Sequence, residues 1–200
     1  MRNPVMLGPA LAFLLFTASG TTHAADSRTP GSSAGEAPAA AAAPQPVAAP
    51  YDLQFLDTMI QHHRGAIEMA RLAEQKAQHD ELKTFARKTQ KDQQQDIEEM
   101  QRYRERWYGG KPDAVNAALP GMRGTLGMEM GPLQDAKGDA FDRLFLDMIK
   151  KHHDGAVALS KDAQQKAAHP ELRKLAGKML QMNQEDIKKV ERWQTAWYSK

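Results

Sequence analysis

Residues 55–66 have the sequence FLDTMIQHHRGA, and residues 145–156, ninety positions later, repeat it as FLDMIKKHHDGA. The same ninety-residue shift, applied without a gap, pairs further positions, among them Asp52 with Asp142, His79 with His169, Asp96 with Asp186, Trp107 with Trp197 and Tyr108 with Tyr198. A repeat of this length is longer than a solenoid unit, and two copies do not make an array. We therefore interpret it as one duplicated helical hairpin whose two halves share a core.

Each half has the hydrophobic periodicity of two long amphipathic helices. At 100° per residue, the apolar side chains between residues 55 and 70 fall on one face together with His63, while Arg64 and Glu68 lie opposite. We expect Asp52 and Asp142 to cap their helices and the first helix to end near Ala77. The second helix carries a seam with alternating four- and three-residue spacing through Leu82, Ala86, Thr89, Gln93, Asp96, Met100, Tyr103 and Trp107.

These patterns predict an all-α fold. It is a ferritin-like four-helix bundle over residues 51–200, made of repeat one (51–108) and repeat two (141–200). A long crossover, residues 109–140, joins the two hairpins, and one long crossover is typical of ferritin-like folds. We expect this crossover to run the length of a helix and to start the second hairpin parallel to the first.

The first fifty residues are typical of an export signal followed by a linker. Arg2 precedes an apolar run at residues 10–16, and small residues surround Ala24, so we predict a signal peptide over residues 1–24. Residues 25–50 are rich in Ala and Pro, which indicates a flexible tether. The apolar run is too short to span a bilayer. We expect a periplasmic or secreted protein with no stable membrane insertion after cleavage.

Composition excludes several classes of function. The 27 Lys and Arg residues nearly balance the 25 Asp and Glu residues, for a net charge of +2, and there is no basic arm, so we expect no nucleic-acid partner. The absence of cysteine excludes disulfides, thiolate zinc sites and iron–sulfur clusters. Any soft-metal chemistry must therefore use methionine and histidine.

The doubled histidine pairs are the strongest chemical signal in the chain. Neighbouring histidines on a helix point about 100° apart, so each ring needs other ligands, and methionines lie at helical spacing from each pair. The predicted metal ligands are His62, His63, Met59, Met69, His152, His153 and Met148, with Met122, Met128 and Met130 of the crossover as additional candidates. Thioether and imidazole favour Cu(I), with Ag(I) possible and Cu(II) tolerated. Asp96 and Asp186 are predicted to lie behind the imidazoles and to fix their tautomers.

The two quoted stretches, extended to Ala70 in the first copy, resemble the signature of the exported bacterial domain-of-unknown-function family 305 (DUF305). The His-x-Glu-Leu turns at residues 79–82 and 169–172 extend the resemblance to about residues 51–200. The better-understood members are CopM-like periplasmic copper-binding proteins. The resemblance implies a ferritin-like bundle, binding of Cu(I) and Ag(I) through Met and His, and a part in metal tolerance. The chain departs from the family pattern at Ile149 and Leu159, where methionine is usual.

We therefore predict an exported, non-enzymatic protein that sequesters copper or hands it on, with metal ions as partners and a copper chaperone or efflux component as a further partner. Because imidazole is protonated near pH 6.5, metal binding should weaken as the pH falls through that range. One alternative is a metal-free structural or partner-binding bundle whose histidines satisfy Asp96 and Asp186. A di-iron oxidase ranks behind both, because it needs Glu-x-x-His motifs and the chain contains none.

Overall fold

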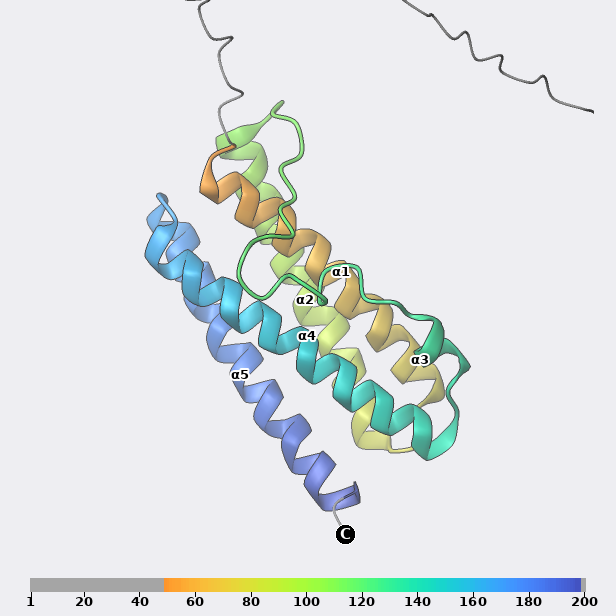
Figure 1. Ribbon diagram of the computed structural model, residues 1–200. Helices are drawn as coiled ribbons and strands as arrows, with labels where there is room; N and C mark the ends of the chain where they lie inside the picture. The colour runs from red at the N-terminus through yellow and green to blue at the C-terminus, as the bar shows by residue number, and fades with distance from the viewer. Residues whose placement is uncertain (1–48, 199–200) are drawn as a thin grey trace, which may run out of the picture. The chain divides into compact units, whose positions relative to one another are not determined.

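The computed structural model describes residues 49–198, and the secondary structure over this range is helical (Figure 1). The helices are α1 (Tyr51–Lys76), α2 (Asp80–Tyr108), the short α3 (Gly131–Asp135), α4 (Gly138–Lys166) and α5 (Pro170–Tyr198). The predicted all-α class is confirmed. The predicted signal peptide and nearly all of the predicted linker lie outside the described residues.

Two helical hairpins form the described part of the chain. α1 packs along α2, α4 packs along α5, and the hairpins meet mainly through α1 and α4. As predicted, the first helix ends next to Ala77, where an extended backbone conformation breaks the helix. Ala167 has the same role in the second hairpin. The crossover carries α3, which contacts both α1 and α4 and buries Leu133.

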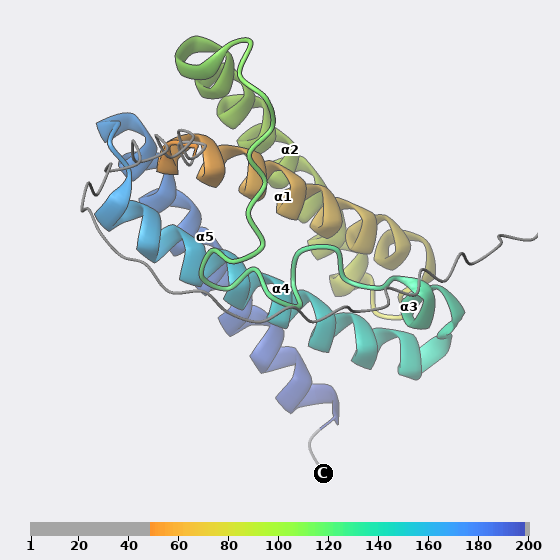
Figure 2. The ribbon, with the colours of Figure 1, turned by 45° about the horizontal axis from the view of Figure 1, so that its top comes forward.

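The predicted parallel orientation of the two hairpins is wrong. Tyr51 at the start of α1 donates a hydrogen bond to Asp162 near the end of α4, at 2.9 Å, so α1 and α4 run antiparallel (Figures 1 and 2). The physical reason lies in the crossover. α2 ends where α1 starts, so a crossover that runs the length of the bundle must deliver α4 to the opposite end.

The predicted capping role of two aspartates is also wrong, because each carboxylate binds the turn of the other hairpin. Asp142 accepts hydrogen bonds from the backbone N–H groups of Gln78 and His79, at 3.1 Å each, and lies 2.7 Å from His79 Nδ1. Asp52 makes the equivalent contacts with Ala168 and His169. Both carboxylates are buried. These contacts join the ends of the two hairpins.

Aromatic rings complete these two junctions. The imidazole of His79 stacks on Trp197 with 3.9 Å between ring centroids, and His169 stacks on Trp107 at 3.8 Å. Each imidazole is thus held by a carboxylate on its edge and an indole on its face, and about a third of each side chain stays exposed. We call each Asp–His–Trp set an end clamp.

The crossover packs tightly against the middle of α4. A Cβ atom added to Gly155 would lie 2.6 Å from the carbonyl oxygen of Gly121 and 2.7 Å from Thr125 Oγ1. Gly121 itself has a φ of +78°, a conformation that favours glycine. Met122, next to it, is fully buried. The absence of a side chain at Gly155 therefore lets the crossover cover this face of the bundle.

We expect Gly155→Ala to lower the free energy of unfolding by about 1–3 kcal/mol, because the added methyl group must displace the crossover backbone. Gly65→Ala is the matched control. Its Cβ would meet only His152 Nε2, at an ordinary 3.5 Å, and alanine is the better helix former. Chemical denaturation of both variants checks this. Equal effects on stability would contradict the proposed close contact.

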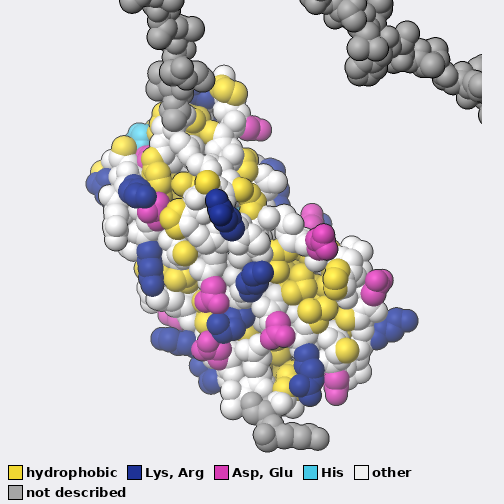
Figure 3. All heavy atoms as spheres, viewed as in Figure 1, with side chains coloured by type: hydrophobic (Ala, Val, Ile, Leu, Met, Phe, Trp, Pro, Cys, Tyr) yellow, Lys and Arg dark blue, Asp and Glu magenta, His cyan; other side chains and the backbone are white. Residues whose placement is uncertain are grey.

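The surface carries mixed charges. Figure 3 shows basic and acidic side chains interspersed on one face, with apolar patches between them and almost no histidine. No helix within residues 49–198 combines the length and apolar character needed to cross a bilayer.

Candidate metal centre

The four predicted histidines lie together at the centre of the bundle. His62 from α1 and His152 from α4 stack with 3.6 Å between ring centroids. His63 lies 6.4 Å from His62, and His153 lies 6.3 Å from His152, again between centroids. All four side chains are buried, with at most 1% of each residue exposed. The antiparallel packing of α1 on α4 brings the two pairs together into one cluster.

Most ring nitrogens of this cluster lack a hydrogen-bond partner. His152 Nε2 donates to the backbone carbonyl of His62 at 3.0 Å, which leaves its Nδ1 as the atom with a free lone pair. Within residues 49–198, both ring nitrogens of His62, His63 and His153 are also without a partner. Leaving buried polar atoms unpaired costs free energy. Such atoms are what an imidazole metal site presents before the ion binds.

Burial favours the neutral form of three of these imidazoles, those of His62, His152 and His153. The loss of hydration lowers the pKa of His62 and His152 well below 6.5, and the neighbouring histidines act in the same direction. Burial and the nearby His63 lower the pKa of His153 to about 3. A neutral imidazole has a lone pair that can bind a metal ion, so the environment favours the ligand form. The weakening of metal binding predicted near pH 6.5 is therefore shifted to lower pH, because these pKa values lie below that of a free imidazole.

The two aspartates predicted to support the histidines have different surroundings. Asp96 Oδ2 lies 3.8 Å from His63 Nε2, longer than a hydrogen bond, while its Oδ1 accepts one from Lys178 at 3.1 Å. Burial by itself raises the pKa of Asp96, but His63 and Lys178 together outweigh it, so that the pKa is lowered. Asp186 lies 4.0 Å from Lys88, and burial raises its pKa. Asp96 thus approaches a histidine, whereas the nearest charged group to Asp186 is a lysine.

The predicted methionine ligands divide between two apolar clusters. Met59 and Met122 are fully buried in the cluster at the start of α1. Met69 is fully buried in the other cluster, and Met148, Met128 and Met130 pack against it while partly exposed. Both clusters therefore contain thioethers on the same elements as the histidines.

Two further buried methionines were not among the predicted ligands. Met100 of α2 and Met179 of α5 are fully buried in the same cluster as Met59. Their seam positions indicated core packing, and nothing in their spacing distinguishes a ligand from a packing residue. The end clamps were also missed, although the ninety-residue shift pairs both their aspartates and their histidines.

The donor set fits a soft ion better than a hard one. Within the described residues, no group of three or more His, Asp or Glu side chains is arranged to hold a metal ion. An ion of low coordination number can use one or two imidazoles and a thioether, and that preference is typical of Cu(I) and Ag(I).

Comparisons with known proteins identify the family and include metal-bound relatives. The family model described as domain of unknown function DUF305 matches residues 52–194. Among solved structures, CopM in its Cu(I)-bound form is 32% identical, with a TM-score of 0.64, and the match covers 74% of this chain and 97% of CopM. CopM has also been solved with Cu(II) at 32% identity and a TM-score of 0.65, with 74% and 97% coverage.

Silver-bound CopM, obtained by co-crystallization, matches at 31% identity with a TM-score of 0.63, and coverage is 74% of this chain and 97% of CopM. A DUF305 protein of Streptomyces coelicolor, described as secreted, is 21% identical with a TM-score of 0.62, covering 70% and 90% of the two chains. At that identity the likeness shows the fold alone. A comparison with curated proteins gives no match.

Proposed function

The chain belongs to the DUF305 family, and on that premise we propose that it is an exported protein that binds Cu(I), or Ag(I), through core histidines and methionines. It sequesters the ion or hands it on, contributes to metal tolerance, and performs no covalent chemistry. Export is supported by the leader-like first 24 residues. We propose a copper chaperone or efflux component as the protein that exchanges the ion with it, and a ferritin-like bundle as the scaffold.

One observation carries the proposal. Four buried imidazoles, most of their ring nitrogens unpartnered, lie on α1 and α4, and α1 also carries the fully buried thioethers of Met59 and Met69. His62 and His152 are the central pair, flanked by His63 and His153, and the nearest predicted thioethers in sequence are Met59, three residues before His62, and Met148, four before His152. When bound, a soft ion would satisfy lone pairs that the metal-free protein leaves unused. The copper- and silver-bound forms of CopM support the same class of ion.

The alternative of a metal-free bundle receives less support. It requires the histidines to satisfy the seam aspartates, but Asp96 lies beyond hydrogen-bond distance of His63. Asp186 has Lys88 as its nearest charged partner. A di-iron oxidase would need Glu-x-x-His motifs, which the chain does not contain.

Native mass spectrometry of the mature chain with Cu(I) tests the proposal. We expect the wild-type protein to retain the ion, the His62→Ala/His63→Ala variant to lose affinity by at least about tenfold, and Met59→Leu to bind more weakly at nearly unchanged volume. Equal uptake by all three proteins would refute the site. Helix content by circular dichroism verifies that each variant is folded.

Thermal unfolding provides a second readout of the same proposal. An ion that binds only the folded state at a hundredfold excess over its Kd stabilises by about 2.7 kcal/mol, or roughly 5–10 °C for a domain of this size. A melting temperature that Cu(I) leaves unchanged would favour the metal-free bundle.

A further inference from the structure

The histidine cluster is sealed from solvent, so a metal ion needs a passage to it. One face is closed by the crossover, where Gly121 and Thr125 pack directly against Gly155, two residues from His153. α1 also packs closely along α2 and along α4, and α4 packs along α5. The remaining face is the seam between α2 and α5, where the two helices meet through long side chains rather than close backbone packing.

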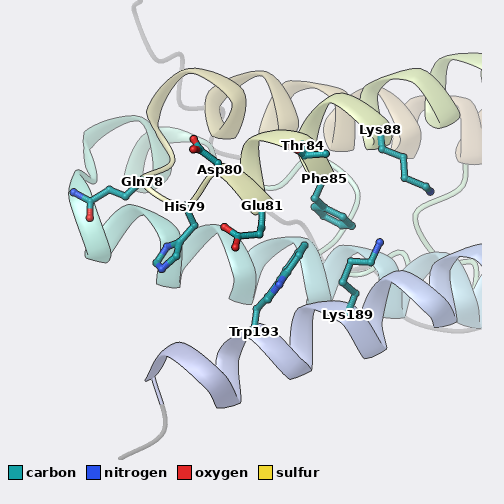
Figure 4. Close-up of a pocket in the computed structure, with 9 residues that line it drawn as sticks. All are labelled: Gln78, His79, Asp80, Glu81, Thr84, Phe85, Lys88, Lys189 and Trp193. Atoms are coloured by element: carbon teal, nitrogen blue, oxygen red, sulfur yellow. The ribbon is translucent and has the colours of Figure 1, made fainter.

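The seam opens into a groove beside His153. An open groove of about 710 Å³ lies between the first turns of α2 and the second half of α5, with Phe85, Lys88, Lys189 and Trp193 in its walls. Figure 4 shows Phe85 and Lys88 pointing into it from α2, and Trp193 and Lys189 from α5. A second groove of about 300 Å³ shares both lysines. It adds the thioether of Met182 and the carboxylate of Asp186.

Phe85 separates this groove from the histidine cluster. Its ring centroid lies 6.3 Å from that of His153 and 5.5 Å from that of Trp193, with interplanar angles of 81° and 84°. Only 3% of Phe85 is exposed, although the residue lines the groove. One aromatic side chain therefore stands between the groove and an imidazole whose two ring nitrogens lack partners within residues 49–198.

The charges around this opening are only partly compensated, because the second groove is lined by Lys88, Lys188, Lys189 and Arg192 against Glu185 and Asp186. Lys88 donates to Asp92 at 2.6 Å and lies 4.0 Å from Asp186. Lys189 lies over the Phe85 ring at 5.9 Å. Both lysine side chains are long and reach the surface, so they can swing aside without unpacking a helix.

The part of the α2–α5 seam next to His63 is closed by a shorter ion pair than the part next to His153. There Lys178 bonds Asp96 at 3.1 Å, and the same carboxylate lies 3.8 Å from His63 Nε2. Leu175 occupies the position that the ninety-residue shift pairs with Phe85. The two halves of the seam therefore differ, although their histidines correspond.

We propose that metal ions reach and leave the histidine cluster through the α2–α5 seam beside His153, with the Phe85 ring as the movable plug. This inference rests on the proposed metal-binding function. Met182, in the wall of the adjoining groove, is the first soft donor that an incoming monovalent ion meets.

Rates of Cu(I) uptake test the passage. Transfer of Cu(I) from its bicinchoninate complex can be followed by stopped-flow absorbance. It should be about tenfold faster in Phe85→Ala than in wild type, which corresponds to a barrier lowered by about 1.4 kcal/mol. The number of ions bound should stay the same. Leu175→Ala is the matched control and should keep the wild-type rate. Phe85→Leu is the milder variant, to be used if Phe85→Ala does not fold. It places at position 85 the residue type that the second repeat has at Leu175. Equal rates in all variants, or equal acceleration by Leu175→Ala, would overturn the passage.

A metal-free measurement distinguishes this inference from the proposed function. Modification by diethyl pyrocarbonate, located by peptide mass spectrometry, should become faster at His153 in Phe85→Ala and stay slow at His63. If wild-type protein takes up no Cu(I), the proposed function fails whatever the labelling shows. If it takes up Cu(I) while neither the uptake rate nor the labelling of His153 changes in Phe85→Ala, only the proposed passage is wrong.

Discussion

Replacing Asp142 by alanine is expected to lower the free energy of unfolding by about 3–5 kcal/mol. The carboxylate is fully buried and accepts from the backbone N–H groups of Gln78 and His79, with His79 Nδ1 at 2.7 Å. Alanine leaves these donors without an acceptor and frees the imidazole that stacks on Trp197. Urea denaturation followed by circular dichroism measures the loss.

Three comparisons make this prediction specific. Asp52→Ala should cost about as much as Asp142→Ala, because Asp52 has equivalent contacts with Ala168 and His169. Asp142→Asn should recover part of the loss, because the amide oxygen still accepts. Asp154→Ala removes an exposed carboxylate that, among residues 49–198, pairs only with Lys150, and it should change little. If Asp142→Ala were no more costly than Asp154→Ala, the end clamps would have no role in stability.

The metal-free protein should lose stability as the pH falls from about 6.5 toward about 3. The pKa values of His62, His152 and His153 are lowered in the folded state. The unfolded chain therefore binds more protons in this window, so stability rises with pH across it. His153 alone, with its pKa lowered to about 3, accounts for about 3 kcal/mol between pH 6.5 and pH 4.

Denaturation in the presence of a chelator, repeated at pH 7, 6, 5 and 4, measures this slope. A His153→Leu variant removes one of the three titrating groups and should flatten the curve. A stability that stays constant or increases on acidification would show that the imidazoles are hydrated and not sealed in the core.

The parts of the fold that depend on local pattern were predictable. Periodicity placed the helices, and Ala77 was correctly expected at the end of the first one. The direction of α4 depends on which end of the bundle the crossover reaches, and a crossover that leaves the end of α2 and runs the length of a helix gives the antiparallel direction instead of the predicted parallel one. The contacts of Asp52 and Asp142 were missed because their partners lie more than sixty positions away in the sequence.

For the candidate site, the amino-acid pattern shows which side chains are available: doubled His-His pairs, methionines at helical spacing and no cysteine. How these side chains meet depends on the packing of the helices. Antiparallel packing of α1 on α4 stacks His62 on His152, and the loose α2–α5 seam leaves Phe85 between solvent and His153. Helix periodicity specifies the face on which a side chain lies. Its partner across the core depends on the packing of segments that are distant in the chain, which no local pattern encodes.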